Sequence, residues 1–329
     1  MTRRELLLTP AAAALASNGR TSMGVATTSY ALKGAADPLE FLDYCHSLGS
    51  GGVQMGIRNA DPKAVRTRAE KYAMWVEVFL SLPADAAAVE SFERGVIAAT
   101  AAGATVARIV MLAGRRYETF DTLESFRQFA DRSWRSLTLA EPIARKHRFH
   151  LAIENHKDWR VPEMLAMLKR ISSEYVGVLV DTGNSISLLD DPMAVVEAYA
   201  PFAMATHIKD MGVESYPEGF LLSEVPLGDG FLNMPRMIQL LSQAKPGIRF
   251  SLEMMTRDPL KVPCLTPKYW ATMPDLPASE LAKTLALVRN NPPKKPLPRI
   301  AGLTRQQQLD YEDQNVRLCL AYARDTLRL

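Results

Sequence analysis

Four stretches of sequence decide the fold: FHLAIENH at residues 149–156, VGVLVDTGN at 176–184, AMATHIKD at 203–210 and RFSLEM at 249–254. Each contains a short apolar run rich in Val, Ile, Leu, Ala or Phe, as expected for a parallel strand covered on both faces, and we predict strands at residues 149–154, 176–181, 203–208 and 249–254. Each then presents an acid or a histidine near its end. Such residues at equivalent positions of successive strands predict one shared site as well as one fold.

Four similar apolar runs precede these stretches, at residues 24–29, 52–56, 75–80 and 105–112. Eight strands alternating with helical segments predict an α/β fold, a single (β/α)₈ TIM barrel, because a parallel sheet of eight strands closes on itself. A doubly wound open sheet is the alternative. It would normally carry a G-x-G-x-x-G phosphate loop after its first strand, and residues 24–30 lack one.

Amphipathic segments separate the predicted strands. We expect helices at residues 38–48, 62–73, 84–102, 123–146, 162–172, 192–199, 234–243 and 278–289. Three of them open with Asp-Pro, at Asp37, Asp61 and Asp191, which is an N-cap followed by proline at the first helical position. A C-terminal extra helix is expected at residues 304–326, packed outside the barrel.

The first residues form a separate segment. TRRELLL at 2–8 and the Ala-rich stretch that ends at Ala16 resemble a twin-arginine export signal with a small-residue cleavage site. Residues 1–20 are therefore either such a signal or a disordered N-terminus, and residues 21–329 form the barrel. A functional signal would make the protein periplasmic, and without one it is cytoplasmic. No later segment approaches the ~20 apolar residues of a membrane helix.

Charge and cysteine content narrow the class of protein. The formal net charge of +3 over 329 residues, with no dense block of Lys and Arg, argues against a nucleic-acid partner. Cys45, Cys264 and Cys319 are far apart and form no CxxC pair, so we interpret them as small apolar residues. A chain of this length can bury a large core without disulfides.

The strand ends predict a metal site. Active sites of TIM barrels lie at the carboxyl ends of the strands, where Glu154, Asp181, His207 and Glu253 would meet. Taken singly, each acid would more often be a salt-bridge partner and the histidine a structural group. Together, three carboxylates would repel one another unless a cation lay between them. Three oxygen donors and one imidazole suit Mn²⁺, Mg²⁺ or Co²⁺, with Mn²⁺ the first choice.

These motifs carry a family resemblance. AIENH at 152–156, VDTGN at 180–184, HIKD at 207–210 and SLE at 251–253 resemble the core of the xylose isomerase-like barrels, the sugar phosphate isomerase/epimerase or endonuclease IV-like superfamily. VPLGDG at 225–230 is similar to the loop after the seventh-strand histidine there. The resemblance implies a metal-dependent enzyme. The superfamily includes isomerases, epimerases, dehydratases, decarboxylases and a DNA-repair nuclease.

The resemblance also implies roles for single residues. The four predicted ligands match the positions that bind Mn²⁺ or a similar ion in ketose epimerases, and Glu154 and Glu253 match the carboxylates that move protons on opposite faces of the substrate. Asn184 stands where many epimerases and the nuclease branch have a histidine, which argues against the nuclease's three-metal cluster. Lys209 is the nearby cation where some epimerases have an arginine.

Four residues are candidates for binding the substrate: His156, Lys209, Asn184 and Arg257. His156 lies two residues past Glu154 and so on the same side of the chain, where it contacts the substrate or makes a structural hydrogen bond. Arg257 binds a carboxylate or phosphate, or is a loop charge. Lys209 and Asp210 orient the substrate or pair with each other.

The expected function is that of a divalent-metal-dependent isomerase or epimerase acting on a sugar or sugar derivative through a metal-stabilised enediolate. The alternative is a metal-dependent lyase, a decarboxylase or dehydratase of an oxo sugar acid in carbohydrate catabolism. Lys209 and Arg257 and the two departures from the epimerase pattern favour the lyase. A sugar-binding protein without turnover is a third hypothesis, against which the two glutamates argue. The expected partner is a small-molecule carbohydrate, with no nucleic acid and no membrane; a homo-oligomer is left open.

Overall fold

The computed structural model describes residues 19–34 and 37–329. The twin-arginine-like segment falls almost entirely within residues 1–18, so that prediction lies outside the described residues. Among the helices that are described, none is both long enough and apolar enough to cross a membrane.

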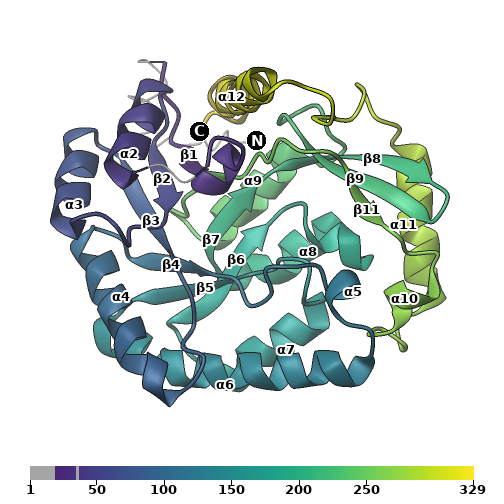
Figure 1. Ribbon diagram of the computed structural model, residues 1–329, viewed down its shortest axis with the longest axis horizontal. Helices are drawn as coiled ribbons and strands as arrows, with labels where there is room; N and C mark the ends of the chain where they lie inside the picture. Colours follow the sequence, from purple (N-terminus) through teal and green to yellow (C-terminus); the bar gives the residue numbers. More distant parts are fainter. Residues whose placement is uncertain (1–18, 35–36) are drawn as a thin grey trace, which may run out of the picture.

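Eight parallel strands close into a barrel in the order β1-β10-β7-β6-β5-β4-β3-β2 (Figure 1). Their bounds are β1 (Gly24–Ala26), β2 (Gly52–Met55), β3 (Trp75–Leu80), β4 (Val106–Ile109), β5 (His150–Glu154), β6 (Val176–Asp181), β7 (Ala203–Ile208) and β10 (Ser251–Leu252). Each lies within a predicted run, so the predicted TIM barrel is confirmed. The first strand is shorter than predicted because a 3₁₀ turn, η1 (Thr27–Tyr30), follows it directly.

Helices surround this barrel (Figure 1). The main ones are α2 (Pro38–Ser47), α3 (Pro62–Lys71), α4 (Val89–Ala101), α6 (Leu123–His147), α7 (Val161–Ile171), α8 (Pro192–Tyr199) and α9 (Met234–Ala244). The side chains of Asp37, Asp61 and Asp191 accept hydrogen bonds from backbone N–H groups of the first turns of α2, α3 and α8, as their Asp-Pro openings predict. Short helices α5 (Arg116–Thr119) and α10 (Pro267–Trp270) lie in the loops that follow β4 and β10.

A second, antiparallel sheet extends the barrel between β7 and α11 (Ala278–Asn290). It consists of β8 (Asp210–Tyr216), β9 (Gly219–Val225) and β11 (Leu260–Val262). Its apolar side and α11 share a small core of their own, including Val213, Phe220 and Val288. This sheet is not among the predicted elements, since the segment after the seventh strand is expected to form only a loop.

The predicted C-terminal helix is present as α12 (Arg305–Tyr322), which continues into a π-helical turn, η5 (Ala323–Leu327). It lies outside the barrel strands, near β1 and α2, at the top of Figure 1. Its residues Val316, Cys319 and Leu320 join the same hydrophobic core as the barrel helices. All three cysteines are buried and free, as predicted.

Candidate metal centre

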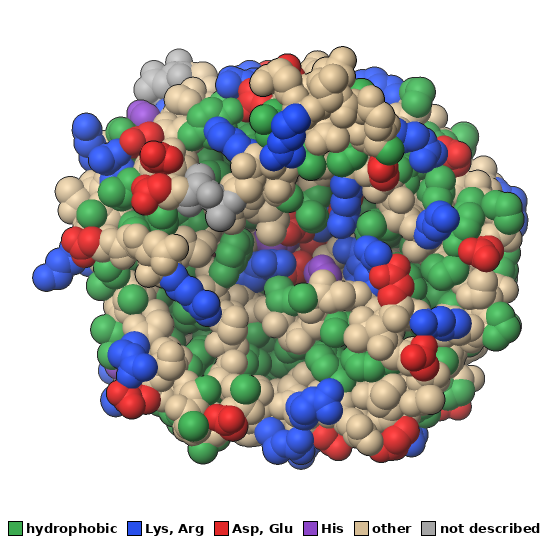
Figure 2. All heavy atoms as spheres, viewed as in Figure 1, with side chains coloured by type: hydrophobic (Ala, Val, Ile, Leu, Met, Phe, Trp, Pro, Cys, Tyr) green, Lys and Arg blue, Asp and Glu red, His purple; other side chains and the backbone are tan. Residues whose placement is uncertain are grey.

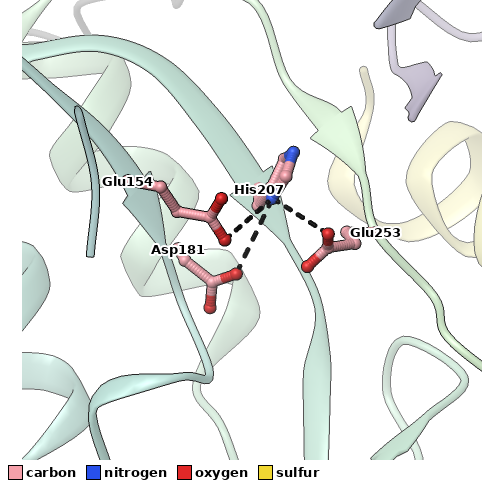
Figure 3. A group of neighbouring side chains, drawn as sticks. All are labelled: Glu154, Asp181, His207 and Glu253. Carbon is pink, nitrogen blue, oxygen red and sulfur yellow. Dashed lines mark ion pairs between the residues drawn. The ribbon is translucent and has the colours of Figure 1, made fainter. Parts of the chain in front are cut away.

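Glu154, Asp181, His207 and Glu253 come together at the carboxyl end of the barrel, with one ligand atom from each lying within 4.8 Å of the others (Figure 3). Glu154 and Asp181 are the last residues of β5 and β6, His207 is the second-to-last residue of β7, and Glu253 follows β10. The Nδ1 atom of His207 is 3.5 Å from Oε1 of Glu154, 3.8 Å from Oδ2 of Asp181 and 3.3 Å from Oε1 of Glu253. The predicted juxtaposition is therefore present.

The donor atoms fit a divalent cation. All four side chains are buried, and burying three carboxylates together is costly without positive charge between them. Nδ1 of His207 is buried and has no hydrogen-bond partner among the described residues, and Oδ2 of Asp181 contacts only Nζ of Lys209, as an ion pair. A buried polar atom without a partner calls for an explanation, and a bound ion is one. The cluster indicates a divalent metal, since its donors are hard oxygens and an imidazole.

Two cations next to the cluster keep its glutamates charged. Burial raises the pKa of Glu154, but Arg108 and His207 outweigh it and hold that pKa below its usual value. Burial acts in the same way on Glu253, where His207 and Lys209 lower the pKa. The pKa of Asp181 is raised, because burial there prevails over the attraction of Lys209. Both glutamates are thus in the proton-accepting form at neutral pH.

Two predicted substrate-binding residues lie against the cluster. Lys209 forms ion pairs with Glu253 and with Asp181, whose Oδ2 is 2.8 Å from the Lys209 Nζ. Asn184 donates from Nδ2 to Oε1 of Glu154 over 3.2 Å and accepts a hydrogen bond from Lys209. It also accepts one from Lys157, a buried residue that is not among the predicted site residues.

The other two predicted substrate-binding residues lie further out. His156 is half-buried, and burial together with Lys157 lowers its pKa to about 3, so the ring is neutral. Arg257 donates to the buried Glu224, with Nε 3.1 Å from Oε2. Arg257 is therefore not a free loop charge but the partly exposed partner of a buried carboxylate on β9.

The Asp210 side chain anchors the loop after β9 by hydrogen bonds and does not form an ion pair with Lys209. Its carboxylate accepts hydrogen bonds from the backbone N–H groups of Met211, Gly228, Gly230 and Leu232, at 2.9 to 3.1 Å. The Val225–Gly230 segment that resembles the family loop is thus anchored one residue beyond Lys209. Of the two sequence alternatives for Asp210, orienting the substrate or pairing with Lys209, the structure shows neither.

Sequence reasoning misses a buried polar chain behind His207. Nε2 of His207 is 2.6 Å from Oε1 of Gln54, and Nε2 of Gln54 donates to Oε2 of Glu77 over 2.9 Å. Burial raises the pKa of Glu77 to about 7. The only signal in the sequence is one polar residue inside each of two apolar strands, GVQM and WVEVFL.

Arg108 is a further missed residue. It lies in β4, its Nε donates to Glu154, and its Nη2 is 4.0 Å from Oε1 of Glu253. It also lines a cavity of about 710 Å³ beside the cluster. Figure 2 shows the centre of this face hollowed, with basic, acidic and histidine side chains visible at the bottom.

Comparison with known proteins gives three findings. The model of the family described as "Xylose isomerase-like TIM barrel" matches residues 42–272. The 3-oxo-isoapionate decarboxylase of Pectobacterium atrosepticum is 28% identical over 102 residues, which are 30% of this chain and only 37% of that protein. Solved structures of similar fold form the third finding.

Two of these structures are informative. An L-ribulose 3-epimerase has a TM-score of 0.57 and 15% identity, covering 92% of this chain and 95% of that chain. A xylose isomerase-like TIM barrel protein from Mycobacterium smegmatis, in complex with magnesium, has a TM-score of 0.52 and 17% identity, covering 82% of this chain and 99% of that chain. At such identities the likeness shows the fold alone.

Proposed function

The chain belongs to the xylose isomerase-like TIM barrel family, a family of metal-dependent sugar-modifying enzymes, and we propose that it is an isomerase or epimerase of a sugar or sugar derivative. The observation that carries the proposal is the buried Glu154, Asp181, His207 and Glu253 cluster at the mouth of the barrel, in which Nδ1 of His207 lacks a hydrogen-bond partner among the described residues. Family membership supports a small carbohydrate as substrate.

In this proposal the four clustered side chains are the metal ligands, and Mn²⁺ is the preferred ion, with Mg²⁺ and Co²⁺ as substitutes. The bound ion would act as a Lewis acid that favours negative charge on an oxygen of the substrate. Once a metal has displaced its proton, Nδ1 of His207 would present its lone pair to the cluster, because the opposite nitrogen is engaged by Gln54.

Glu154 and Glu253 are the proposed proton carriers. They come from β5 and from the end of β10, which β6 and β7 separate, so they approach the centre from different sides. Arg108 and Lys209 keep both residues ionised but weaken them as bases. A substrate oxygen that draws either cation away from its glutamate would raise the basicity of that glutamate, which favours proton removal once the substrate is bound.

The second candidate function is that of a lyase, a decarboxylase or dehydratase of an oxo sugar acid. Lys209 and Arg108 favour it, because two cations at the cluster suit a substrate with its own negative charge. The similarity to a decarboxylase over 102 residues also supports it. An isomerase or epimerase returns a proton to the substrate, whereas a lyase releases CO₂ or a hydroxyl, and this difference distinguishes the two reactions.

Incubation in D₂O tests the proposal. The metal-loaded protein and an EDTA-treated control are given a panel of ketoses and oxo sugar acids, and deuterium at the carbon next to the carbonyl is measured by NMR. Metal-dependent uptake with conversion to an isomer supports an isomerase or epimerase, whereas released CO₂ or an eliminated hydroxyl supports the lyase. No metal-dependent change in any compound, with metal content verified, would contradict both.

A further inference from the structure

The mouth of the barrel has two chemically different halves. The clustered acids and His207 lie on β5, β6, β7 and β10. The cavity of about 710 Å³ lies over the ends of the other four strands. Its lining residues include Thr27 after β1, Arg58 and Asn59 after β2, Ser81 after β3 and Arg108 in β4. Two arginines and one acid, Asp37, line this half, and no acid of the metal cluster does.

Arg108 connects the two halves. Its guanidinium lies 5.0 Å from the centre of the Phe79 ring and is mostly buried, with 13% of its side chain exposed. Only Nε makes a hydrogen bond with a described residue, to Glu154. Nη2 also lies 4.0 Å from Oε1 of Glu253, an ion pair without a hydrogen bond, so the N–H groups of Nη1 and Nη2 can still donate into the cavity that this side chain lines.

Arg58 supplies a second guanidinium to the same cavity. It is exposed and, within residues 19–34 and 37–329, it forms no ion pair. Two cations deeper in the mouth already form ion pairs: Lys209 with Asp181 and Glu253, and Arg257 with Glu224. Arg58 is thus free to pair with a charge that the protein does not provide.

The net charge of the metal-loaded site is positive. A divalent cation held by three carboxylates and a neutral imidazole leaves one negative charge at the cluster. Arg108 and Lys209 contribute two positive charges in direct contact with it. The loaded centre therefore carries an excess of one positive charge, and Arg58 and Asp37, which line the cavity with opposite charges, leave that excess unchanged. Such an excess in a secluded cleft attracts an anion.

We propose that Arg108 and Arg58 bind a carboxylate of the substrate, so that the substrate is a sugar acid and not a neutral sugar. The proposal rests on the proposed function, since it places the carbonyl end of the same molecule at the metal cluster. The planar, forked guanidinium matches a carboxylate in two parallel hydrogen bonds. A single negative charge also balances the excess at the centre, whereas a phosphate dianion would exceed it.

Binding of inert analogues tests this directly. Calorimetric titration of the metal-loaded protein with ribonate, ribitol and ribitol 5-phosphate compares a carboxylate, a neutral polyol and a phosphate ester without any turnover. We expect ribonate to bind at least about tenfold more tightly than ribitol, and its affinity to fall with rising salt.

Substitutions locate the carboxylate. Arg58→Gln should weaken ribonate binding by about fivefold to tenfold and leave ribitol unchanged, and Arg108→Lys should recover more affinity than Arg108→Gln. Metal content is measured in each variant because Arg108 contacts Glu154. Arg66→Gln is the matched control. It removes the same charge from α3, where Arg66 packs beside Gly103 in the loop that enters β4, at the opposite end of the barrel.

Three outcomes would overturn the proposal: equal affinity for ribonate and ribitol, tighter binding of the phosphate ester, or a ribonate preference that survives in both arginine variants. The last result would place the carboxylate on the metal. These outcomes are independent of the D₂O assay. Metal-dependent exchange in a neutral ketose with no carboxylate preference would refute only the anion site, and a carboxylate preference without exchange would refute only the proposed reaction.

Discussion

Nε2 of His207 donates its hydrogen to Oε1 of Gln54, over 2.6 Å. The direction follows from the next link, because Nε2 of Gln54 donates to Glu77 and so leaves Oε1 as the acceptor. The ring nitrogen that faces the three carboxylates is therefore Nδ1. Gln54 is a positioning residue that selects which nitrogen of His207 is offered to the metal.

Gln54→Leu should reduce metal affinity by about 10- to 100-fold, because His207 loses the acceptor that fixes its orientation. Competition with a chromophoric chelator measures the affinity. Gln54→Glu is the control and should keep most of the affinity. Its carboxylate can still accept the hydrogen bond from His207, and a protonated Glu77, whose pKa is about 7, can donate the hydrogen bond between residues 54 and 77. Wild-type affinity in Gln54→Leu would show that the hydrogen bond has no part in metal binding.

Metal affinity should depend on pH through His207. Burial lowers the pKa of this ring, but Glu253 and Glu154 prevail and raise it to about 9 in the metal-free protein. Below that pH a metal must displace a proton, so affinity should rise nearly tenfold per pH unit up to about 9 and then level off. Calorimetry in buffers of different ionisation enthalpy should show about one proton released per metal near neutral pH. Affinity independent of pH would mean that His207 is not a ligand.

The protein should hold about one divalent ion per chain, since its four candidate ligands form one cluster. Elemental analysis after EDTA treatment and reloading measures the stoichiometry. His207→Ala should weaken retention by more than about 100-fold, because loss of a direct ligand should exceed the effect of losing its orienting partner. Full activity in a rigorously metal-free preparation would refute the prediction.

Glu154→Gln and Glu253→Gln should bind substrate and turn over slowly. Glutamine keeps the size of glutamate but cannot accept a proton, and loss of a general base commonly lowers rates by about 10²–10⁴. Metal content must be matched to the wild type, since both residues are also candidate ligands. If both fully loaded variants kept near-normal rates, the two-glutamate mechanism would be wrong, and His156 and Lys209 would be the next bases to test.

Asp210→Asn should lower the free energy of unfolding by about 2–4 kcal/mol. Both carboxylate oxygens accept backbone hydrogen bonds, so an amide would turn one acceptor into a donor that faces N–H groups. Asp229→Asn in the same loop removes only an ion pair to the exposed Lys295 and should cost less than about 1 kcal/mol. Denaturant titration compares the two variants, and equal losses would contradict the anchoring role.

The barrel could be predicted because its strands are buried on both faces and so form unbroken apolar runs. Gly177 to Val180 has no polar residue, and β6 has the predicted bounds. The hairpin of β8 and β9 could not be predicted in this way. Its strands mix buried Val213 with exposed Glu214 and Ser215, and Glu224 is a buried charge whose partner, Arg257, is distant in sequence.

The metal cluster could be predicted because its residues recur at equivalent strand ends. Arg108, Gln54 and Glu77 could not, since each is a lone polar residue in an apolar run with no spacing to mark it. Lys209 and Asn184 could be predicted as residues of the site, but their contacts within it could not. Their contacts with Glu253 and Glu154 depend on side-chain directions that only the closed barrel determines.

The small antiparallel sheet has a consequence for engineering. The hairpin of β8 and β9, residues 210–225, leaves the barrel directly after Lys209, and its sheet packs on α11 in a core separate from the barrel's. A designer could therefore exchange this appendage for another of equal span and keep the catalytic frame, provided that Asp210 retains its loop. Such chimaeras would offer a modular route to new substrate preference on an unchanged metal platform.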